Sequence, residues 1–289
     1  MNLFELQKHK LDYFASCPLF LEDLLLEEVK AVEVRATNTV HGGVEFEAYN
    51  ENVLALILKS RIASRVFKKY YSFYIRDEKE LTQALRDVKW REIFPADLRF
   101  KVMSHVGGDV RGFSRAFQNT LYLSQLVKDS IVDHFKKFDN FRPNVDVKFP
   151  EATIYIHITP EHSSKGKRLK VAVLMDLCGD PISDRSLRPL SRSVMAPLRE
   201  NLAAGIVMLA NWNPKEERLV DLMCGSGTIL AEAYMIAKNI PPSFKRVKLY
   251  LDTQDQIFAF QNLWWFQNDK HLMKEFESLV QQVDTQMQT

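Results

Sequence analysis

Hydrophobic residues along the first part of the chain alternate between helical and extended spacing. Helical spacing occupies residues 19–31 and residues 50–59, the second stretch with Asn50 as its predicted N-cap. Extended runs that are rich in aromatic and β-branched side chains lie at residues 10–17, 32–36, 43–47 and 64–75. The resulting order, strand–helix–strand–strand–helix–strand, predicts a ferredoxin-like α+β domain over residues 1–76.

A second α+β pattern covers residues 77–178. Residues 78–88 and 122–138 have the apolar spacing of amphipathic helices. Extended runs lie at residues 99–106, 145–149, 152–159 and 168–177. We therefore expect a second domain that mixes helices and strands.

The pattern changes again after this second domain. Residues 179–194 are crowded with Gly, Pro, Ser and Asp, which is typical of a linker. The remaining segment, residues 195–289, opens with a predicted helix at 195–212, a short buried strand at 217–223 and a helix at 227–239. This order predicts the beginning of a doubly wound, Rossmann-like α/β domain that stays incomplete within the chain.

The sequence DLMCGSGT joins that predicted strand to the helix after it. Asp221 is placed at the carboxyl end of the strand, where open parallel sheets bind ligands. Gly225 and Gly227 lack Cβ atoms, so the backbone can turn sharply and a ligand can approach closely. Thr228 opens the helix, whose free N–H groups favour a carboxylate or another anion. The spacing fits neither a P-loop nor a full dinucleotide fingerprint, so a tight turn without a ligand is the alternative interpretation.

Composition and charge limit the classes of protein to which this chain can belong. The 289 residues carry a net charge of only +2, which does not by itself indicate nucleic-acid binding. The three cysteines lie far apart and form no CxxC pair, and the sequence has neither a secretory leader nor an apolar run long enough to span a membrane. We expect a cytoplasmic protein without a membrane or metal site.

The stretch DLMCGSGTILAEA resembles motif I of class I S-adenosylmethionine-dependent methyltransferases. Its amino-acid sequence is most similar to the same motif in bacterial 23S ribosomal RNA guanine-N2 methyltransferases of the RlmL type. Other stretches resemble that family in the same order: the opening DYFASCPLFLEDLLLEEVK, the helix LVKDSIVDHF of its THUMP domain, and the junction VAVLMDLCGDPISDRSLRPLSRSVMAPLRENLAAGIV. The resemblance covers most of the chain.

The resemblance implies an RNA-binding THUMP domain at residues 77–178 and S-adenosyl-L-methionine as cofactor. It also implies that the helix containing Glu200 and Asn201 leads into the site. The residues that it assigns to the cofactor loop are Asp221, Cys224, Gly225, Ser226, Gly227 and Thr228. Catalytic residues stay unassigned.

The chain departs from the family pattern in its last part. The family's Asn/Asp-Pro-Pro-Tyr motif, which holds the target amino group, is absent, and NIPPSF at residues 239–244 matches a different loop. We therefore expect the chain alone to bind S-adenosylmethionine weakly or not at all and to be inactive. A truncated or split gene explains the pattern, as does a second chain that supplies the rest of the sheet. A non-catalytic RNA-binding or assembly module and a THUMP-containing tRNA methyltransferase are the alternative functions.

These expectations predict two binding surfaces, one for the second chain and one for RNA. An aromatic stretch near the end of the sequence either forms an exposed apolar surface that binds the second chain or packs on the helix at 195–212. Its residues are Trp264, Trp265 and Phe266. Basic residues predict contacts with RNA phosphates, in large-subunit ribosomal RNA if the resemblance holds. These residues are Lys165, Lys167, Arg168, Lys170, Arg185 and Arg188. The alternative interpretation is a solvated hairpin and linker.

Overall fold

The computed structural model describes residues 11–163, 166–185 and 198–288. The chain folds into two compact units, each built from separate segments. Unit 1 comprises Met1–Val66, Asp180–Phe258 and Asp269–Thr289. Unit 2 comprises Phe67–Gly179 and Ala259–Asn268. The chain therefore crosses between the units four times, and the predicted boundaries at residues 76, 178 and 194 remain predictions.

The first segment of unit 1 has the predicted ferredoxin-like order of elements, from β1 to the start of β4. Strand β3 pairs antiparallel with both β1 and β2, and helices α2 and α3 follow β1 and β3. The element bounds are β1 (Leu11–Ser16), α2 (Glu22–Lys30), β2 (Thr37–Val40), β3 (Gly43–Ala48), α3 (Asn50–Lys59) and β4 (Arg65–Ile75). The apolar faces of the two helices are buried, including Leu25, Leu54 and Ile57.

Two local predictions for this segment were wrong. The second strand lies at Thr37–Val40 and not at residues 32–36, because Glu33 adopts a left-handed φ of 59° that no strand accommodates. Asn50 is the first residue of α3 and not its N-cap. Its side chain instead accepts a hydrogen bond from the Tyr13 hydroxyl at 2.5 Å, so Asn50 ties the helix to β1.

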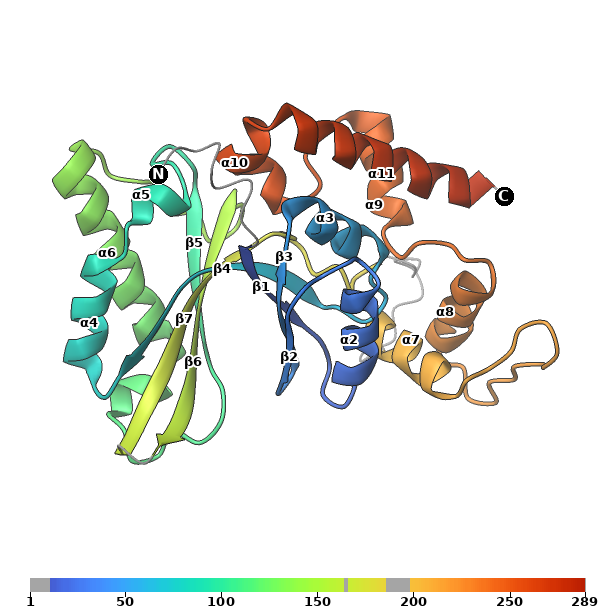
Figure 1. The fold of residues 1–289 in the computed structure, drawn as a ribbon, viewed down its shortest axis with the longest axis horizontal. Helices are drawn as coiled ribbons and strands as arrows, with labels where there is room; N and C mark the ends of the chain where they lie inside the picture. The colour runs from blue at the N-terminus through green and yellow to red at the C-terminus, as the bar shows by residue number, and fades with distance from the viewer. Residues whose placement is uncertain (1–10, 164–165, 186–197, 289) are drawn as a thin grey trace. The chain divides into compact units, whose positions relative to one another are not determined.

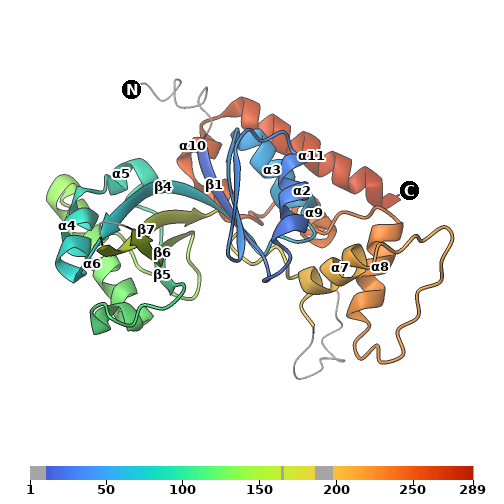
Figure 2. The same ribbon diagram turned by 60° about the horizontal axis from the view of Figure 1, so that its bottom comes forward.

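The rest of unit 1 is helical in the part that the structure describes. Helices α7 (Glu200–Leu209) and α8 (Thr228–Ala237) pack side by side, and the loop between them projects away from both (Figures 1 and 2). Helix α11 (Lys270–Gln288) lies against α3 and α9 (Phe244–Thr253) and buries Phe276 and Val283. These helices confirm the predicted helical pattern around the glycine turn.

The strand predicted at residues 217–223 is not formed. These residues have no regular secondary structure, and Val220, Leu222 and Met223 are 72%, 92% and 92% exposed. A β-strand needs a neighbour to satisfy its backbone hydrogen bonds. Within residues 198–288 the structure contains no other strand, so the apolar run has nothing to pair with and its side chains face solvent.

Unit 2 is a sheet covered by helices on one face. Its strand order is β4-β7-β6-β5, with β5 (Phe100–Val106) parallel to β6 (Ala152–Ser163) and β7 (Gly166–Asp176) antiparallel to β4 and β6. Helices α4 (Glu78–Asp87) and α6 (Thr120–Asp139) cover the same face (Figure 1). The short elements are α5 (Trp90–Ile93) and a 3-10 turn, η1 (Arg115–Gln118).

The core of unit 2 lies between this sheet and its helices. Phe94, Phe100 and Phe135 form a buried aromatic cluster, in which the centroid of the Phe94 ring lies 5.4 Å from that of Phe100 and 5.4 Å from that of Phe135. The extended run predicted at residues 145–149 is not a strand: only Val145 forms a bridge to Phe100, and Val147 and Phe149 are 66% and 72% exposed. Asp146 instead accepts hydrogen bonds from the amides of Lys148 and Phe149, which turns the backbone out of an extended path.

A late segment completes unit 2 through η3 (Ala259–Asn262) and α10 (Trp264–Gln267). Trp265 and Phe266 are 8% and 5% exposed, and Phe266 packs against Phe260 at 5.0 Å between ring centroids. The Lys68 ammonium lies 4.4 Å from the centroid of the Trp265 ring. The interpretation of this stretch as an exposed apolar surface was therefore wrong for these two residues, which are buried within unit 2.

Candidate functional site

The glycine turn before α8 carries the predicted cofactor residues. Gly225 and Gly227 have φ angles of 53° and 77°, in the left-handed region that favours glycine. The amide of Gly227 donates to the Cys224 carbonyl at 2.7 Å, and α8 begins at the next residue. A Cβ atom built on Gly227 meets nothing within 4 Å, so this glycine serves the backbone conformation and leaves open space above the turn.

The polar side chains of the turn are organised by short-range hydrogen bonds. Asp221 accepts from the amide of Met223 at 3.1 Å. The hydroxyls of Ser226 and Thr228 lie 3.0 Å apart at the N-terminus of α8. Cys224 is an exposed free thiol. The turn therefore presents hydroxyls beside the positive end of a helix, an arrangement suited to a carboxylate group.

A buried ion pair fixes α8 within unit 1. Glu232, one turn after Thr228, pairs with the Arg185 guanidinium, and both side chains are fully buried. Burial raises the pKa of Glu232 above its ordinary range, and the charge of Arg185 opposes that rise. The same guanidinium donates to the Arg61 carbonyl at 2.5 Å, so it joins α8 to the turn that follows α3.

The turn after α3 is itself held by buried polar groups. Arg61 donates to the Ile240 carbonyl at 2.7 Å. Burial lowers the pKa of Arg61, and the nearby positive charge of Arg185 lowers it further. Glu28 accepts from the Ser60 hydroxyl at 2.6 Å and from the Arg61 amide at 2.8 Å. Burial raises the pKa of Glu28 despite these hydrogen bonds.

Helix α7 reaches the same turn. The side-chain amide of Asn201, which is fully buried, donates to the Ile62 carbonyl at 3.1 Å and to the Ser64 hydroxyl at 2.9 Å. The two helices that flank the glycine turn are thus both bound to residues 60–64 of the ferredoxin-like segment. This network positions the turn, because buried polar groups tolerate only the geometry that satisfies them.

Sequence reasoning missed the key members of this network. Glu232 is the single carboxylate of the apolar stretch TILAEAYMIA. Because an unpaired carboxylate is rarely buried, its position could have indicated a buried ion pair. Its partner Arg185 lies 47 positions earlier in the sequence, and Arg61 lies 124 positions before Arg185. The pairing could therefore not be predicted without the three-dimensional fold.

The predicted RNA-contacting residues are separated by the fold. Lys165 and Arg188 lie outside the described residues. Lys167, Arg168 and Lys170 stand together on β7 in unit 2, where Lys167 is exposed. Arg185 lies in unit 1 and is 3% exposed, so its side chain is not presented to an RNA backbone.

Arg168 is held by neighbours on the same sheet face. Its guanidinium lies 3.8 Å from the centre of the Tyr74 ring, and its Nε donates to Glu161 at 2.6 Å. This ion pair neutralises part of the charge that was predicted to meet phosphates. Lys167 is consequently the described residue of the cluster that is best placed to contact an anion.

Family models match three successive segments of the chain. Residues 12–67 match the RlmL ferredoxin-like domain, residues 75–163 match the THUMP domain, and residues 185–285 match the RMKL-like methyltransferase domain. The chain thus matches the models of a THUMP domain and of an RMKL-like methyltransferase domain in two of these segments. The glycine turn lies in the matched methyltransferase segment, whose first residue is the buried Arg185.

Similar proteins agree with this assignment. The chain is 35% identical to the ribosomal RNA large subunit methyltransferase K/L of Photobacterium profundum over 81% of its own length and 30% of the relative's. It is 36% identical to the protein of the same name from Aliivibrio fischeri, over 87% of this chain and 33% of the relative. The chain therefore spans about a third of the length of the curated relatives it matches.

Solved structures share the fold of the chain. A protein described as a predicted N6-adenine-specific DNA methylase from Listeria monocytogenes superposes with a TM-score of 0.73 at 22% identity, over 99% of this chain and 67% of that one. A methyltransferase complexed with SAH gives a TM-score of 0.71 at 24% identity, over 96% of this chain and 65% of that one. At these identities the likeness establishes the fold alone.

Among the described residues, no group of three or more His, Cys, Asp and Glu side chains gathers in a way that could hold a metal ion. Within the same residues, no helix is both long and apolar enough to cross a membrane.

Proposed function

We propose that the chain contributes to methyl transfer from S-adenosylmethionine to the exocyclic N2 of a guanine in large-subunit ribosomal RNA. The observation that carries this proposal is the glycine turn at the start of α8, held by a buried network in a segment that matches the methyltransferase model. The relatives that bear the name of a ribosomal RNA large subunit methyltransferase support the choice of RNA. A cytoplasmic location belongs to the same proposal.

The residues present fit only part of the cofactor. The Ser226 and Thr228 hydroxyls and the N-terminus of α8 suit the carboxylate of the methionine moiety, and the space above Gly227 is open. In residues 198–288 the structure shows no strand whose end would bring a carboxylate to the ribose hydroxyls. The cofactor supplies a methyl group on a sulfonium. This chain's residues contribute a binding turn and the contacts that position it.

We therefore expect weak cofactor binding and no activity for the chain alone. Isothermal titration with S-adenosylmethionine should give a Kd above about 1 mM, and methyl incorporation into unmodified ribosomal RNA should be undetectable. Gly227→Ala serves as the matched control, since a left-handed φ disfavours alanine and should abolish any residual binding. Micromolar affinity, about −8 kcal/mol, that Gly227→Ala removes would show that the turn suffices without further strands.

The exposed apolar run before the turn supports a second part of the proposal. Val220, Leu222 and Met223 would become the strand of a parallel sheet when neighbouring strands from another polypeptide segment pair with them. Hydrogen exchange tests this directly. Amides of residues 217–223 should gain protection when the methyltransferase segment that a K/L relative has beyond the matched region is added. Leu222→Asp should prevent the protection, and Leu209→Asp, at another exposed leucine that lies on α7, should not.

The alternative is a non-catalytic RNA-binding or assembly module. The absent Asn/Asp-Pro-Pro-Tyr motif favours it for this chain. A THUMP-containing tRNA methyltransferase is the other candidate. The structure of TrmN from Thermus thermophilus has a TM-score of 0.57 at 21% identity, a likeness of fold alone. Competition between large-subunit ribosomal RNA fragments and tRNA for the chain separates these substrates.

A further inference from the structure

Residues 136–149 of unit 2 expose aromatic side chains beside basic ones. The segment runs from the last turn of α6 into the loop before β6. Phe138, Phe141 and Phe149 are 55%, 47% and 72% exposed. Single exposed apolar residues are ordinary on protein surfaces, but a group of large ones on one segment marks an interaction surface. The basic residues of the segment are Lys136, Lys137, Arg142 and Lys148.

Hydrogen bonds attach this segment to the first residue of β5. The amide of Phe100 donates to the Asn144 carbonyl at 3.0 Å, and the amide of Asp146 donates to the Phe100 carbonyl at 3.1 Å. The Asp146 side chain then accepts from the amide of Phe149 at 2.9 Å. These bonds define the path of the backbone that carries Phe149, so the exposed ring belongs to a built surface.

The carboxylates of the segment do not neutralise its cations. Asp139 pairs with Arg91 at 3.0 Å, and Asp146 lies 3.7 Å from Arg99. Both arginines lie outside the segment. Among the residues that the structure describes, none of the segment's four basic side chains forms an ion pair, and all four are exposed. The surface therefore keeps an excess of positive charge.

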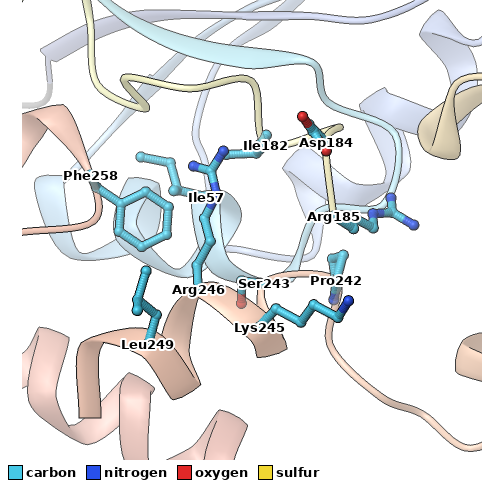
Figure 3. Close-up of a pocket in the computed structure, with 10 residues that line it drawn as sticks. All are labelled: Ile57, Ile182, Asp184, Arg185, Pro242, Ser243, Lys245, Arg246, Leu249 and Phe258. Carbon is cyan, nitrogen blue, oxygen red and sulfur yellow. The ribbon is translucent and has the colours of Figure 1, made fainter. Parts of the chain in front are cut away.

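The cavity at the start of α9 in unit 1 offers a contrast. Figure 3 shows Arg185 and Arg246 beside it. Arg185 is paired with Glu232, and Arg246 donates to the Pro181 carbonyl at 2.7 Å. These arginines hold unit 1 together, whereas the basic side chains of residues 136–149 face solvent. Availability to a ligand thus distinguishes the segment in unit 2.

Aromatic rings interleaved with cations suit single-stranded nucleic acid. The rings provide faces on which bases stack, and the cations contact the backbone phosphates. The Lys137 ammonium lies 5.2 Å from the centre of the Phe138 ring, so a cation and a ring occur side by side. The bases of a duplex are already stacked on one another, and only unpaired bases can use such rings.

An anionic membrane is the other surface that attracts aromatic and basic residues. Such binding typically uses an amphipathic helix that lies in the plane of the interface. Residues 140–151, all of which the structure describes, contain no helix, and Phe141 and Phe149 belong to this stretch. The geometry therefore favours RNA over a membrane.

We propose that residues 136–149 bind unpaired nucleotides of RNA. Phe141 and Phe149 stack on bases, and the basic side chains of the segment contact the phosphates. The inference rests on the proposed RNA substrate and specifies the form in which it binds. The N2 amino group of a guanine is paired in a duplex, so a guanine that is methylated there has to leave the duplex.

The segment is separate from the basic cluster on β7. It lies beside the start of β6, whereas Lys167 is in register with His162 near the end of that strand. Ten strand residues span on the order of 30 Å. Both surfaces belong to unit 2, and the segment lies within residues 75–163, which match the THUMP model.

Fluorescence anisotropy of the full chain with a labelled, short single-stranded oligouridylate tests the stacking. Phe149→Ala should weaken binding about tenfold, the loss expected when one base loses its ring. A duplex RNA of the same length should lose no affinity. Phe20→Ala is the matched control, because this phenylalanine of unit 1 is 91% exposed beside Glu22 and Asp23. Its loss should leave the affinity for the oligouridylate unchanged.

The dependence on salt separates phosphate contacts from stacking. Lys148→Gln should lower the slope of log affinity against log salt by about 0.7 for the phosphate contact that it removes from the single strand. Phe149→Ala should leave this slope unchanged, since its ring contacts no phosphate. Lys248→Gln, at an exposed lysine of unit 1, should change neither the affinity nor the slope. Circular dichroism confirms that each variant is folded.

Two results would overturn the inference: an affinity for oligouridylate that Phe149→Ala leaves unchanged, or equal losses for single-stranded and duplex RNA. Binding to phosphatidylserine vesicles that Phe149→Ala abolishes, with RNA affinity unchanged, would assign the surface to a membrane instead. A ribosomal RNA fragment that still binds in either case leaves the proposed substrate standing. Absence of methyl transfer, in turn, leaves the oligonucleotide test intact.

Discussion

Lys68 shows how a single residue links unit 2 to its late segment. The residue is 7% exposed, and its ammonium lies against Trp265, which follows almost two hundred positions later in the sequence. Burial lowers the pKa of Lys68 to about 7. The unfolded chain therefore binds this proton more tightly than the folded protein between pH 7 and the ordinary lysine pKa of about 10.5.

We predict that the free energy of unfolding depends on pH through Lys68 and that Lys68→Met removes this dependence. Because the pKa is lower in the folded protein than in the unfolded chain, the free energy of unfolding is highest at high pH. It falls as the pH drops towards 7 and levels off below pH 7. Lys68→Met should thus be more stable than wild type by several kcal/mol at pH 6–7, since each pKa unit corresponds to about 1.4 kcal/mol, and the difference should shrink by pH 8.5. Urea unfolding followed by tryptophan fluorescence measures it.

Lys79→Met provides the comparison for this effect. Lys79 is exposed on α4 of the same unit, and exposed substitutions change stability by only about 0.5 kcal/mol. A difference between Lys68→Met and wild type that stays constant from pH 6 to 8.5 would contradict a buried, titrating ammonium.

At the scale of elements, α8 is held by the pair of Glu232 and Arg185. Breaking a buried ion pair by removing one partner leaves an uncompensated charge, at a cost of about 3–5 kcal/mol. We predict that Glu232→Gln destabilises unit 1 by that amount in urea unfolding. The double variant Arg185→Met/Glu232→Leu should recover much of the loss, because it removes both charges.

Glu80→Gln is the control for this pair. Its ion pair with Arg76 is exposed, with 77% of the arginine side chain accessible, and exposed pairs contribute about 0–1 kcal/mol. Equal losses in Glu80→Gln and Glu232→Gln would show that α8 is held by its apolar contacts and not by the ion pair.

Helices were predicted from sequence more reliably than isolated strands. The helical spacing of residues 50–59 and 122–138 was confirmed within a few positions, because each helix satisfies its own backbone and needs only one apolar face. The apolar runs at 145–149 and 217–223 have strand composition but no partner along most of their length, so they stay irregular. The glycine turn was predicted from its sequence, whereas the pairing of Glu232 with Arg185 depends on contacts between distant segments.

At the scale of the whole molecule, RNA binding should depend on a local patch, because the net charge is only +2. We predict that alanine at Lys165, Lys167, Arg168 and Lys170 lowers the slope of log affinity against log salt for a large-subunit ribosomal RNA fragment. Each lost phosphate contact should remove about one unit of slope. Arg168, which is paired with Glu161, should contribute least. Filter binding at several salt concentrations measures the slope.

The control variant changes the same number of charges elsewhere. Alanine is placed at exposed lysines of unit 1, namely Lys238, Lys248, Lys270 and Lys274. These lysines lie outside the patch, so the slope should stay close to that of wild type. Equal slopes for the two variants would mean that RNA is attracted by diffuse charge.

The four crossings of the chain between the units also constrain the order in which the protein folds during synthesis. Unit 2 contains Phe67–Gly179 but is completed by Ala259–Asn268. While the intervening residues leave the ribosome, the side of unit 2 that contacts Trp265 is uncovered, and the ammonium of Lys68 stays hydrated. Neither unit reaches its final packing as an independent early domain. The nascent chain therefore exposes this apolar side of unit 2 until residues 259–268 have been synthesised, and such transiently exposed surfaces favour aggregation.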